Sequence, residues 1–326
     1  MTGGPVFVAG LERTGTSLMY ALLASHPRLA MTRRTNLWRH FYLQFGDLDV
    51  PANLDRCLDT MRRYKRIVGL EIEWERLRGD LVGGQITYGR LFALLQEQYA
   101  ERLGRPRWGD KSLLTERYAE ALLQSYPQAR ILHMIRDPRD RFASSFTRWK
   151  VRRGGVGAGT AEWLSSARIA LRNEGRFAGS YRSVRYESLV RDPEGTLRDI
   201  CAFIGEDYEP EMLAMNGAPT LRDGGNSSYG RLEGGTISTS SVGRFTEVLS
   251  PRQIAYMQLM TGSEMAAFGY EPAAVRMPMG ARLGFAIRDV PVESAHLLVW
   301  RTRERMRDRT GRPLRPDRLV HQESAA

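Results

Sequence analysis

The first predicted element is a short apolar stretch near the start of the chain. Residues 5–9 (PVFVA) are apolar without interruption, and a glycine-rich turn follows them. Over residues 17–25 the apolar side chains recur every three or four positions, which is the spacing of one helix face. A continuous apolar run bounded by turns is typical of a buried parallel strand. The chain is therefore expected to open with a strand, a loop and a helix.

The same patterns predict further strands and a series of helices. Residues 130–135 (RILHMI) form a second apolar run, and residues 183–186 form a shorter one. Apolar spacing and capping residues predict helices over residues 83–104, 116–125, 142–150, 161–176 and 192–205, and another that begins at Ser250. Residues 31–64 also look helical. By contrast, residues 154–159 and 223–241 have the glycine-rich composition of flexible segments.

Strands that alternate with helices predict the α/β class, with a mainly parallel central sheet flanked by helices. With 326 residues the chain is long enough for a sizeable core. We expect one P-loop-like α/β domain over residues 1–272. Residues 273–326 contain 11 arginines and no lysine against six acidic residues, a net charge of +5. This basic C-terminal extension is expected either to pack as a helix or to form a partly ordered arm.

Charge and cysteine content narrow the classes of partner. The whole chain has a net charge of +11 and an isoelectric point near 10, which favours polyanionic partners; an arginine-rich surface without such a partner is the alternative. Cys57 and Cys201 follow no metal or disulfide pattern, so both are expected to be buried. We find no signal-peptide pattern and no apolar run of membrane-spanning length, and a cytoplasmic protein is expected.

The turn after the first apolar run carries the first candidate chemistry. Residues 10–17 (GLERTGTS) have the glycine spacing of a phosphate-binding P-loop, in which backbone N–H groups and a helix N-terminus hold the anion. Thr16 stands where a nucleoside-triphosphate site has its lysine. A cation is present two residues before the second glycine, at Arg13. A plain strand-to-helix turn without a ligand is the alternative.

The second candidate site follows the apolar run at residues 130–135. A P-loop NTPase needs an acidic residue there to hold Mg²⁺, and Asp137 is available. The first residue after the run, however, is Arg136. An arginine beside a phosphate loop suggests a ligand with two separate anionic groups, held without a metal ion. The alternative is a surface salt bridge between Arg136 and Asp137 or Asp140.

Together these stretches resemble the sulfotransferases that use 3′-phosphoadenosine 5′-phosphosulfate (PAPS), in a branch that includes protein-tyrosine sulfotransferases and many bacterial members. VFVAGLERTGTSLMYALLASHP is similar to the family's 5′-phosphosulfate loop, and ILHMIRDPRDRFASSF to its 3′-phosphate motif. Three further segments match in the same order: WGDKSLLTERY with its lysine, VRYESLVRDPEGTLRDICAFIG with its adenosine-side tyrosine, and the late basic loop SSVGRFTEVLS. The matches extend from about residue 5 to residue 270.

The resemblance implies a role for each matching residue. The residues implied to bind the 5′ side of the nucleotide are Arg13, Thr14, Gly15, Thr16 and Ser17. The 3′-phosphate is expected to be bound by Arg136 and Ser144, with Arg244 from the late loop. Tyr186 is expected to contact the nucleoside. Arg13 and Lys111 are expected to stabilise the leaving oxygen, with Ser241 as a weaker donor; for Lys111, an ordinary surface lysine in a turn is the alternative.

Proton removal from the acceptor requires a general base, and here the chain departs from the family pattern. The tyrosine-sulfotransferase branch has a glutamate shortly after the sequence SHP, whereas residues 31–36 (MTRRTN) contain no acid. The remaining candidates are Glu12, His40, Glu71, Glu73 and Asp110. We select His40 for its ordinary pKa, with a packed histidine as the alternative. Residues 33–45 line the acceptor pocket or form an ordinary amphipathic helix, and His133 is expected in the core.

The expected reaction is therefore metal-free, in-line transfer of a sulfuryl group from PAPS to a hydroxyl or amine. The acceptor is expected to be a small molecule, a glycan or a lipid, with no nucleic-acid partner and no transmembrane segment. Two alternatives remain. One is a P-loop kinase or NTPase, which requires Mg²⁺ and a triphosphate. The other is a polyanion-binding protein that uses the nucleotide site for regulation.

Overall fold

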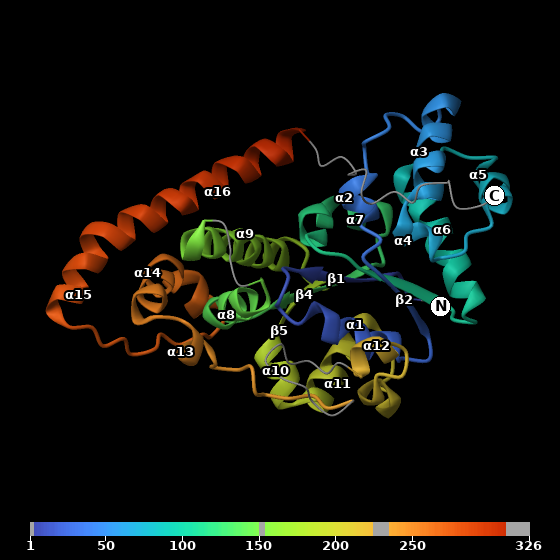
Figure 1. Ribbon diagram of the computed structural model, residues 1–326. Coiled ribbons are helices and arrows are strands. Elements are labelled where there is room, and N and C mark those ends of the chain that lie inside the picture. Colours follow the sequence, from blue (N-terminus) through green and yellow to red (C-terminus); the bar gives the residue numbers. More distant parts are fainter. Residues whose placement is uncertain (1–2, 150–153, 224–234, 311–326) are drawn as a thin grey trace, which may run out of the picture.

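The computed structural model describes residues 3–149, 154–223 and 235–310, and the strands in these ranges form one parallel sheet (Figure 1). The sheet has five strands in the order β2-β3-β1-β4-β5: β1 (Val6–Gly10), β2 (Leu29–Arg33), β3 (Arg107–Lys111), β4 (Arg130–Ile135) and β5 (Tyr181–Arg185). β1 lies in the middle, between β3 and β4. The chain adds β2 and β3 on one side of β1 and then β4 and β5 on the other side. In open α/β sheets, ligands bind outside the carboxyl ends of the strands at such a switch point.

One face of the sheet is covered by helices that share a single apolar cluster. The cluster contains Val6 and Val8 of β1 and the buried side of α1, and it continues onto the helices that follow β5. These helices are α1 (Thr16–Ala24), α10 (Tyr186–Arg191), α11 (Pro193–Ile204), η2 (Pro210–Ala214) and α12 (Pro219–Arg222). Asp192 caps α11 by accepting a hydrogen bond from Gly195 N at 2.9 Å, as its sequence predicts.

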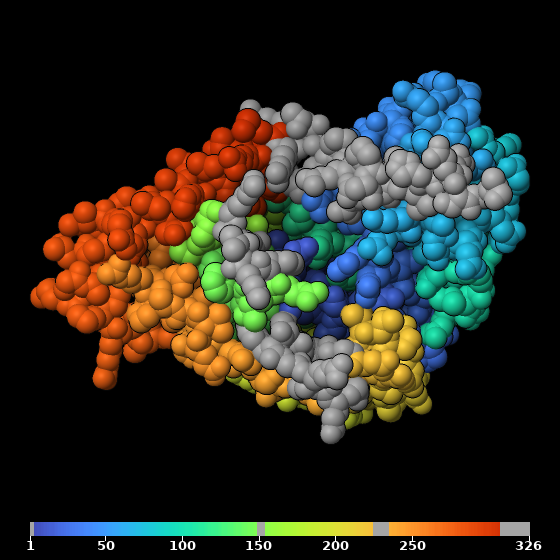
Figure 2. Space-filling view, in the orientation of Figure 1, coloured from blue at the N-terminus to red at the C-terminus, as the bar shows by residue number. Residues whose placement is uncertain are grey.

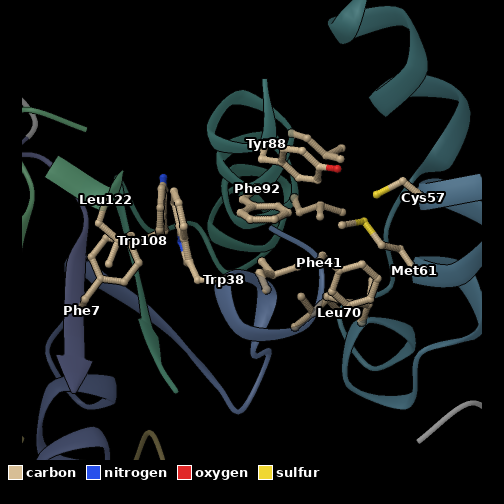
Figure 3. Close-up of a cluster of buried hydrophobic side chains, with 14 of the residues drawn as sticks. Phe7, Trp38, Phe41, Cys57, Met61, Leu70, Tyr88, Phe92, Trp108 and Leu122 are labelled. Atoms are coloured by element: carbon tan, nitrogen blue, oxygen red, sulfur yellow. The ribbon is translucent and has the colours of Figure 1, made fainter. Parts of the chain in front are cut away.

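The opposite face carries a cluster rich in aromatic residues. Its helices are α2 (Leu37–His40), α3 (Pro51–Arg63), α4 (Lys65–Val68), α5 (Trp74–Leu81), α6 (Tyr88–Arg102), η1 (Thr115–Tyr118) and α7 (Ala119–Ser125). Figure 3 shows Trp38 between the Phe7–Trp108 pair and Phe92. Trp38 is 5% exposed and meets Phe92 edge to face at 5.4 Å. Cys57 is also fully buried here, and burial raises the pKa of its thiol to about 12. Both cysteines are buried, which confirms that expectation.

A third group of helices is built on α9, which contacts β5. It contains α8 (Pro138–Trp149), α9 (Gly155–Arg176), α13 (Phe245–Val248), α14 (Pro251–Ala267), α15 (Met279–Gly284), η3 (Phe285–Asp289) and α16 (Val290–Thr310). The predicted extension therefore forms a helix as far as residue 310, and α16 packs along α9 (Figure 1). Leu297 of α16 is buried against the cluster around Trp163. Among the described residues, no helix is both long and apolar enough to cross a bilayer.

The predicted α/β class with a parallel sheet is confirmed, and the elements at residues 5–9, 17–25 and 130–135 form as expected. The helical interpretation of residues 31–33 is wrong, because they form the end of β2. β3 was not predicted either. Both strands end in polar residues, Thr32 and Arg33 in one and Asp110 and Lys111 in the other, so neither shows the apolar run of a buried strand.

The flexible break expected at residues 154–159 is also wrong, because α9 begins at Gly155. The glycines there allow close packing: a Cβ at Gly157 would lie 2.0 Å from the backbone oxygen of Glu293 in α16. A Cβ at Gly159 would lie 2.3 Å from the ring of Phe142 in α8. Most of the expected loop at residues 223–241 lies outside the described residues.

Candidate active site

The phosphate loop joins β1 to α1 through three residues in the left-handed backbone region. Gly10 has φ 122°, Arg13 has φ 70° and Gly15 has φ 92°. Gly15 also has no room for a side chain, since a Cβ there would lie 2.6 Å from the ring of Tyr186. α1 begins at the next residue, Thr16. In Figure 2 the dark-blue start of the chain lies at the bottom of a hollow in the middle of the molecule.

The hydroxyl groups of the loop have two different positions: one stabilises the turn, and two lie at the start of helix α1. Thr14 is 1% exposed, and its hydroxyl donates to the carbonyl of Leu11 at 2.8 Å. Thr14 therefore stabilises the turn. Thr16 and Ser17 stand in the first turn of α1, the end of the helix whose backbone N–H groups lack intrahelical acceptors. This end of the helix favours an anion.

The two predicted anion sites are connected by hydrogen bonds. Arg13 Nε donates to the hydroxyl of Ser144 in α8 at 3.0 Å. Arg136, at the end of β4, donates from Nη1 to the carbonyl of Arg13 at 3.2 Å. Arg13, Arg136 and Ser144 thus come from a loop, a strand end and a helix that are far apart in the sequence. The fold brings together the residues that the motifs assign to the 5′ and 3′ ends of one nucleotide.

Arg136 is a buried cation that donates hydrogen bonds to neutral backbone carbonyls. It is 4% exposed, and Nη2 donates to the carbonyl of Ser241 at 2.6 Å. Its guanidinium lies 4.4 Å from the ring centre of Tyr186. The Tyr186 and Ser241 hydroxyls are hydrogen-bonded at 2.9 Å. Within the described residues Arg136 forms no ion pair, and its Nε is buried without a hydrogen-bond partner. Such a group fits an anionic ligand.

The salt bridge considered for Arg136 is wrong, because the neighbouring acids have other partners. Asp137 binds Arg139 through both carboxylate oxygens, at 3.0 Å to Nε and 2.6 Å to Nη2. Asp140 accepts from the backbone N–H groups of Gly243 and Phe245 at 2.6 and 2.9 Å. The acid that a kinase would use for Mg²⁺, Asp137, is thus engaged with an arginine.

Asp140 also fixes the loop that carries the last predicted nucleotide residue. The two N–H groups it accepts flank Arg244 on either side. Burial raises the pKa of the Asp140 carboxyl to about 6. The half-buried Arg244 guanidinium lies 3.4 Å from the exposed Glu247 carboxylate. The structure therefore places this loop against α8, the helix that carries Ser144.

Lys111 lies at the carboxyl end of β3, paired in register with Val8 of β1. It is 2% exposed, so neither the surface lysine nor the turn considered for this position is correct. Burial, together with the positive charges of Arg34 and Arg33, lowers the pKa of the Lys111 ammonium to about 8. This crowding of positive charge next to the phosphate loop also fits an anionic ligand.

The candidates for the general base lie in different environments in the fold. His40 is buried, with its ring 6.2 Å from that of Tyr64. Asp110 is buried and accepts from the Thr32 hydroxyl at 2.8 Å, and burial raises its pKa. Glu71 pairs with Arg102 at the surface, and Glu73 is exposed. Glu12 belongs to the phosphate loop itself and lines a cavity beside it.

Residues 33–45 do not form one amphipathic helix along a pocket. Trp38, in the middle of this range, lies in the aromatic core. The neighbouring Arg39 lines the cavity that Glu12 also lines. His133 is fully buried and hydrogen-bonded to Tyr181 and Ser166, at 2.6 and 2.9 Å, so its expected core position is confirmed.

Sequence reasoning missed Glu116, which supports the start of the phosphate loop. It is 1% exposed, and one carboxylate oxygen accepts from the backbone N–H of Gly10 at 3.2 Å. The other accepts from the Ser166 hydroxyl at 3.2 Å. Glu116 lies in the segment LLTERY, whose polarity resembles that of a surface turn. No sequence signal distinguishes it from an exposed glutamate.

Comparison with known proteins agrees with this geometry. The model of the "Sulfotransferase family" matches residues 5–210. Protein-tyrosine sulfotransferase A of Caenorhabditis elegans is 26% identical over 215 residues, which are 64% of this chain and 51% of that protein. Protein-tyrosine sulfotransferase 2 of Gallus gallus is 24% identical over 299 residues, or 86% of this chain and 69% of that protein. The chain thus spans about half the length of the first relative.

Solved structures show the same fold. The sulfotransferase domain of the Synechococcus PCC 7002 olefin synthase has a TM-score of 0.56 at 24% identity, covering 82% of this chain and 94% of that one. The sulfotransferase domain of the curacin biosynthetic pathway has a TM-score of 0.54 at 18% identity, covering 83% and 99%. The family resemblance read from the motifs is confirmed, because the family model covers more than half of the residues: the chain belongs to the sulfotransferase family.

Proposed function

We propose that this protein transfers a sulfuryl group from PAPS to an acceptor hydroxyl or amine, without a metal ion. The observation that carries the proposal is Arg136, a buried cation with an orphaned Nε, joined by hydrogen bond to the phosphate loop. PAPS supplies the sulfuryl group and has two separate anionic ends, a 5′-phosphosulfate and a 3′-phosphate. Two linked cationic sites, one at the loop and one at the end of β4, suit such a ligand.

The roles that the family resemblance implies for these residues are supported by their positions. The phosphate loop and the N-terminus of α1 hold the 5′ end, with Arg13 as the nearby cation. Arg136 and Ser144 hold the 3′ end, with Tyr186 against the guanidinium and Arg244 on the adjacent loop. Arg13 and Lys111 stabilise the negative charge that develops on the leaving oxygen. Catalysis of this kind relies on positioning and on fixed charges.

The acceptor and the compartment belong to the proposal as well. The curated relatives are named for protein tyrosines, but residues 31–36 of this chain lack the acid that the motif resemblance led us to expect. We therefore favour a small-molecule, glycan or lipid acceptor over a tyrosyl peptide, and we retain a cytoplasmic location. The family match does not favour the kinase alternative, and neither does the binding of Asp137 to Arg139.

Isothermal titration with adenosine 3′,5′-bisphosphate and adenosine 5′-phosphate tests the proposal. Arg136→Ala is expected to lower the affinity for the bisphosphate by about 30-fold, since a charge-assisted hydrogen bond contributes about 2 kcal/mol. The affinity for the monophosphate should change little. Arg130→Ala, at the opposite end of the same strand, is the matched control and should leave both affinities unchanged. Equal losses for the two nucleotides would show that Arg136 does not serve a 3′-phosphate.

A further inference from the structure

A cavity beside the phosphate loop is partly walled by the basic extension. It has a volume of about 220 Å³ and begins at Leu11 and Glu12, directly before Arg13. Trp300 and Glu304 of α16 line it from the extension. The extension is therefore part of the same site as the phosphate loop.

The charges in this cavity nearly balance, with one negative charge in excess, although the whole chain is strongly basic. Arg117 and Glu304 form an ion pair at 2.7 Å, with side chains 14% and 10% exposed. Arg141 and Glu162 form another at 2.6 Å. The charged lining residues in total are Arg39, Arg117, Arg141, Glu12, Glu116, Glu162 and Glu304, or three positive charges against four negative ones. A polyanion would find no excess of positive charge here.

Apart from Ser166, the uncharged residues that line the cavity are apolar. Leu113 and Leu114 line it from the segment after β3, and Trp300 faces them from α16. Leu114 and Trp300 both pack at the edge of the cluster that contains Trp163. Leu114 has φ 65°, a strained backbone conformation for a leucine that the packing around it must maintain. A flat apolar body therefore fits this wall better than a strongly hydrated one.

Glu12 differs from the other carboxylates of the cavity. Glu304 and Glu162 are paired with arginines, and Glu116 accepts two hydrogen bonds. In the ranges that the structure describes, the Glu12 carboxylate has no hydrogen bond and no ion pair, and its side chain is exposed to the cavity. It precedes Arg13 directly in the loop. It can therefore accept a proton without losing a structural partner.

We propose that this cavity is the acceptor site, that it takes a small uncharged hydroxyl compound whose flat face packs on Trp300, and that Glu12 is the general base. The inference rests on the proposed sulfuryl transfer. In the reaction the acceptor's O–H proton passes to the Glu12 carboxylate, and its oxygen forms a bond to sulfur. The bond between sulfur and the bridging oxygen breaks, and its electron pair leaves with adenosine 3′,5′-bisphosphate.

The binding test uses 2-naphthol as the probe and titrates it into the full-length protein saturated with adenosine 3′,5′-bisphosphate, with heat as the readout. Trp300→Ala is expected to lower the affinity for 2-naphthol at least tenfold. Its affinity for the bisphosphate should stay within twofold of the wild-type value. Trp300→Phe, which keeps an aromatic wall, should recover most of the affinity. Leu298→Ala changes an exposed residue of the same helix and serves as the control.

The test of Glu12 separates binding from turnover. Glu12→Gln should bind 2-naphthol within about threefold of wild type but turn it over at least 100-fold more slowly, because a positioned base contributes a factor of this order. Glu71→Gln, at a surface glutamate paired with Arg102, should behave as wild type in both assays.

The outcomes distinguish this inference from the function on which it rests. Absence of bisphosphate binding would contradict the proposed function itself. If the bisphosphate binds but 2-naphthol does not, or if a heparin oligosaccharide is the preferred acceptor, the inference on the acceptor class is wrong. An unchanged 2-naphthol affinity in both Trp300 variants overturns the placement of the site, and full turnover by Glu12→Gln overturns the assignment of the base.

Discussion

The chemistry of Lys111 depends strongly on its surroundings. Its ammonium is buried at the end of β3 beside Arg33 and Arg34, and its pKa falls to about 8. In the protein without nucleotide it is therefore half neutral near pH 8 and about nine-tenths neutral one pH unit higher. An anionic ligand favours the charged form and so raises this pKa again. Nucleotide affinity should depend on pH in a range where most lysines are fully charged.

We expect the affinity for adenosine 3′,5′-bisphosphate to be constant below about pH 7 and to fall above pH 8, by at most about tenfold per pH unit. The fall comes from the proton that the free protein has lost and must regain on binding. Titration calorimetry from pH 6.5 to 9.5 measures it. Lys111→Arg keeps its charge throughout this range and should give a flat profile. A decline that persists in this variant would assign the effect to another group.

The sequence predicted part of the candidate site at the level of single residues. Arg13, Arg136 and Ser144 belong to motifs with fixed spacing, and the structure brings them into hydrogen-bond contact. Their roles in binding stay predictions. His40 was selected for its ordinary pKa alone, and its burial against Tyr64 is a tertiary property that no local pattern reveals. The same is true of Glu116, whose segment was matched to the family for its lysine and not for this glutamate.

At the scale of elements, α9 shows how packing overrides a local preference. Its first turn is glycine-rich and was expected to be flexible, because glycine lowers helix stability. The backbone of Glu293 in α16 comes so close to Gly157 that a side chain would collide with it. The glycines therefore allow α16 to dock, and the docked helix compensates for their low helix propensity.

Gly157→Ala is expected to destabilise the protein by about 1–3 kcal/mol, since the new methyl group must displace α16 or α9. Urea unfolding gives the free energy, and limited proteolysis reports whether α16 detaches. Gly175→Ala lies in the same helix with no atom within 4 Å of the new Cβ. It should be neutral or stabilising by up to about 1 kcal/mol. Similar losses in both variants would mean that helix docking is not the reason.

At the scale of the whole molecule, the proposed function gives the cationic groups of the site the role that a metal ion has in a P-loop NTPase. Arg13, Lys111 and Arg136 converge near the phosphate loop, while Asp137 is bound to Arg139. We expect sulfuryl transfer and bisphosphate binding to be unchanged by millimolar EDTA and by added Mg²⁺. A transfer assay with labelled PAPS under both conditions checks this. Loss of activity in EDTA with recovery in Mg²⁺ would contradict the metal-free mechanism.

The net charge of the chain is a poor guide to the cavity that we propose for the acceptor. The total of +11 favoured polyanions, but the cavity beside the loop pairs its arginines with glutamates from other elements. Composition sums charges over the molecule, whereas a ligand meets only the few that line its site. The division of the chain at residue 272 stays a prediction, and the packing of α16 on α9 shows that the extension contacts the domain before it.

The sequence by itself determined the fold class, the family and the two anion-binding motifs, because apolar spacing and glycine positions act over a few residues and can be read locally. It did not determine β2 and β3, whose polar ends become strand only when a neighbouring strand is present, β1 for β3 and β3 for β2. It also did not determine the burial of His40 and Lys111 or the cavity between Glu12 and Trp300. Tertiary structure decided these features, because burial and the pairing of distant charges depend on which elements pack together. No local sequence pattern specifies which elements do so.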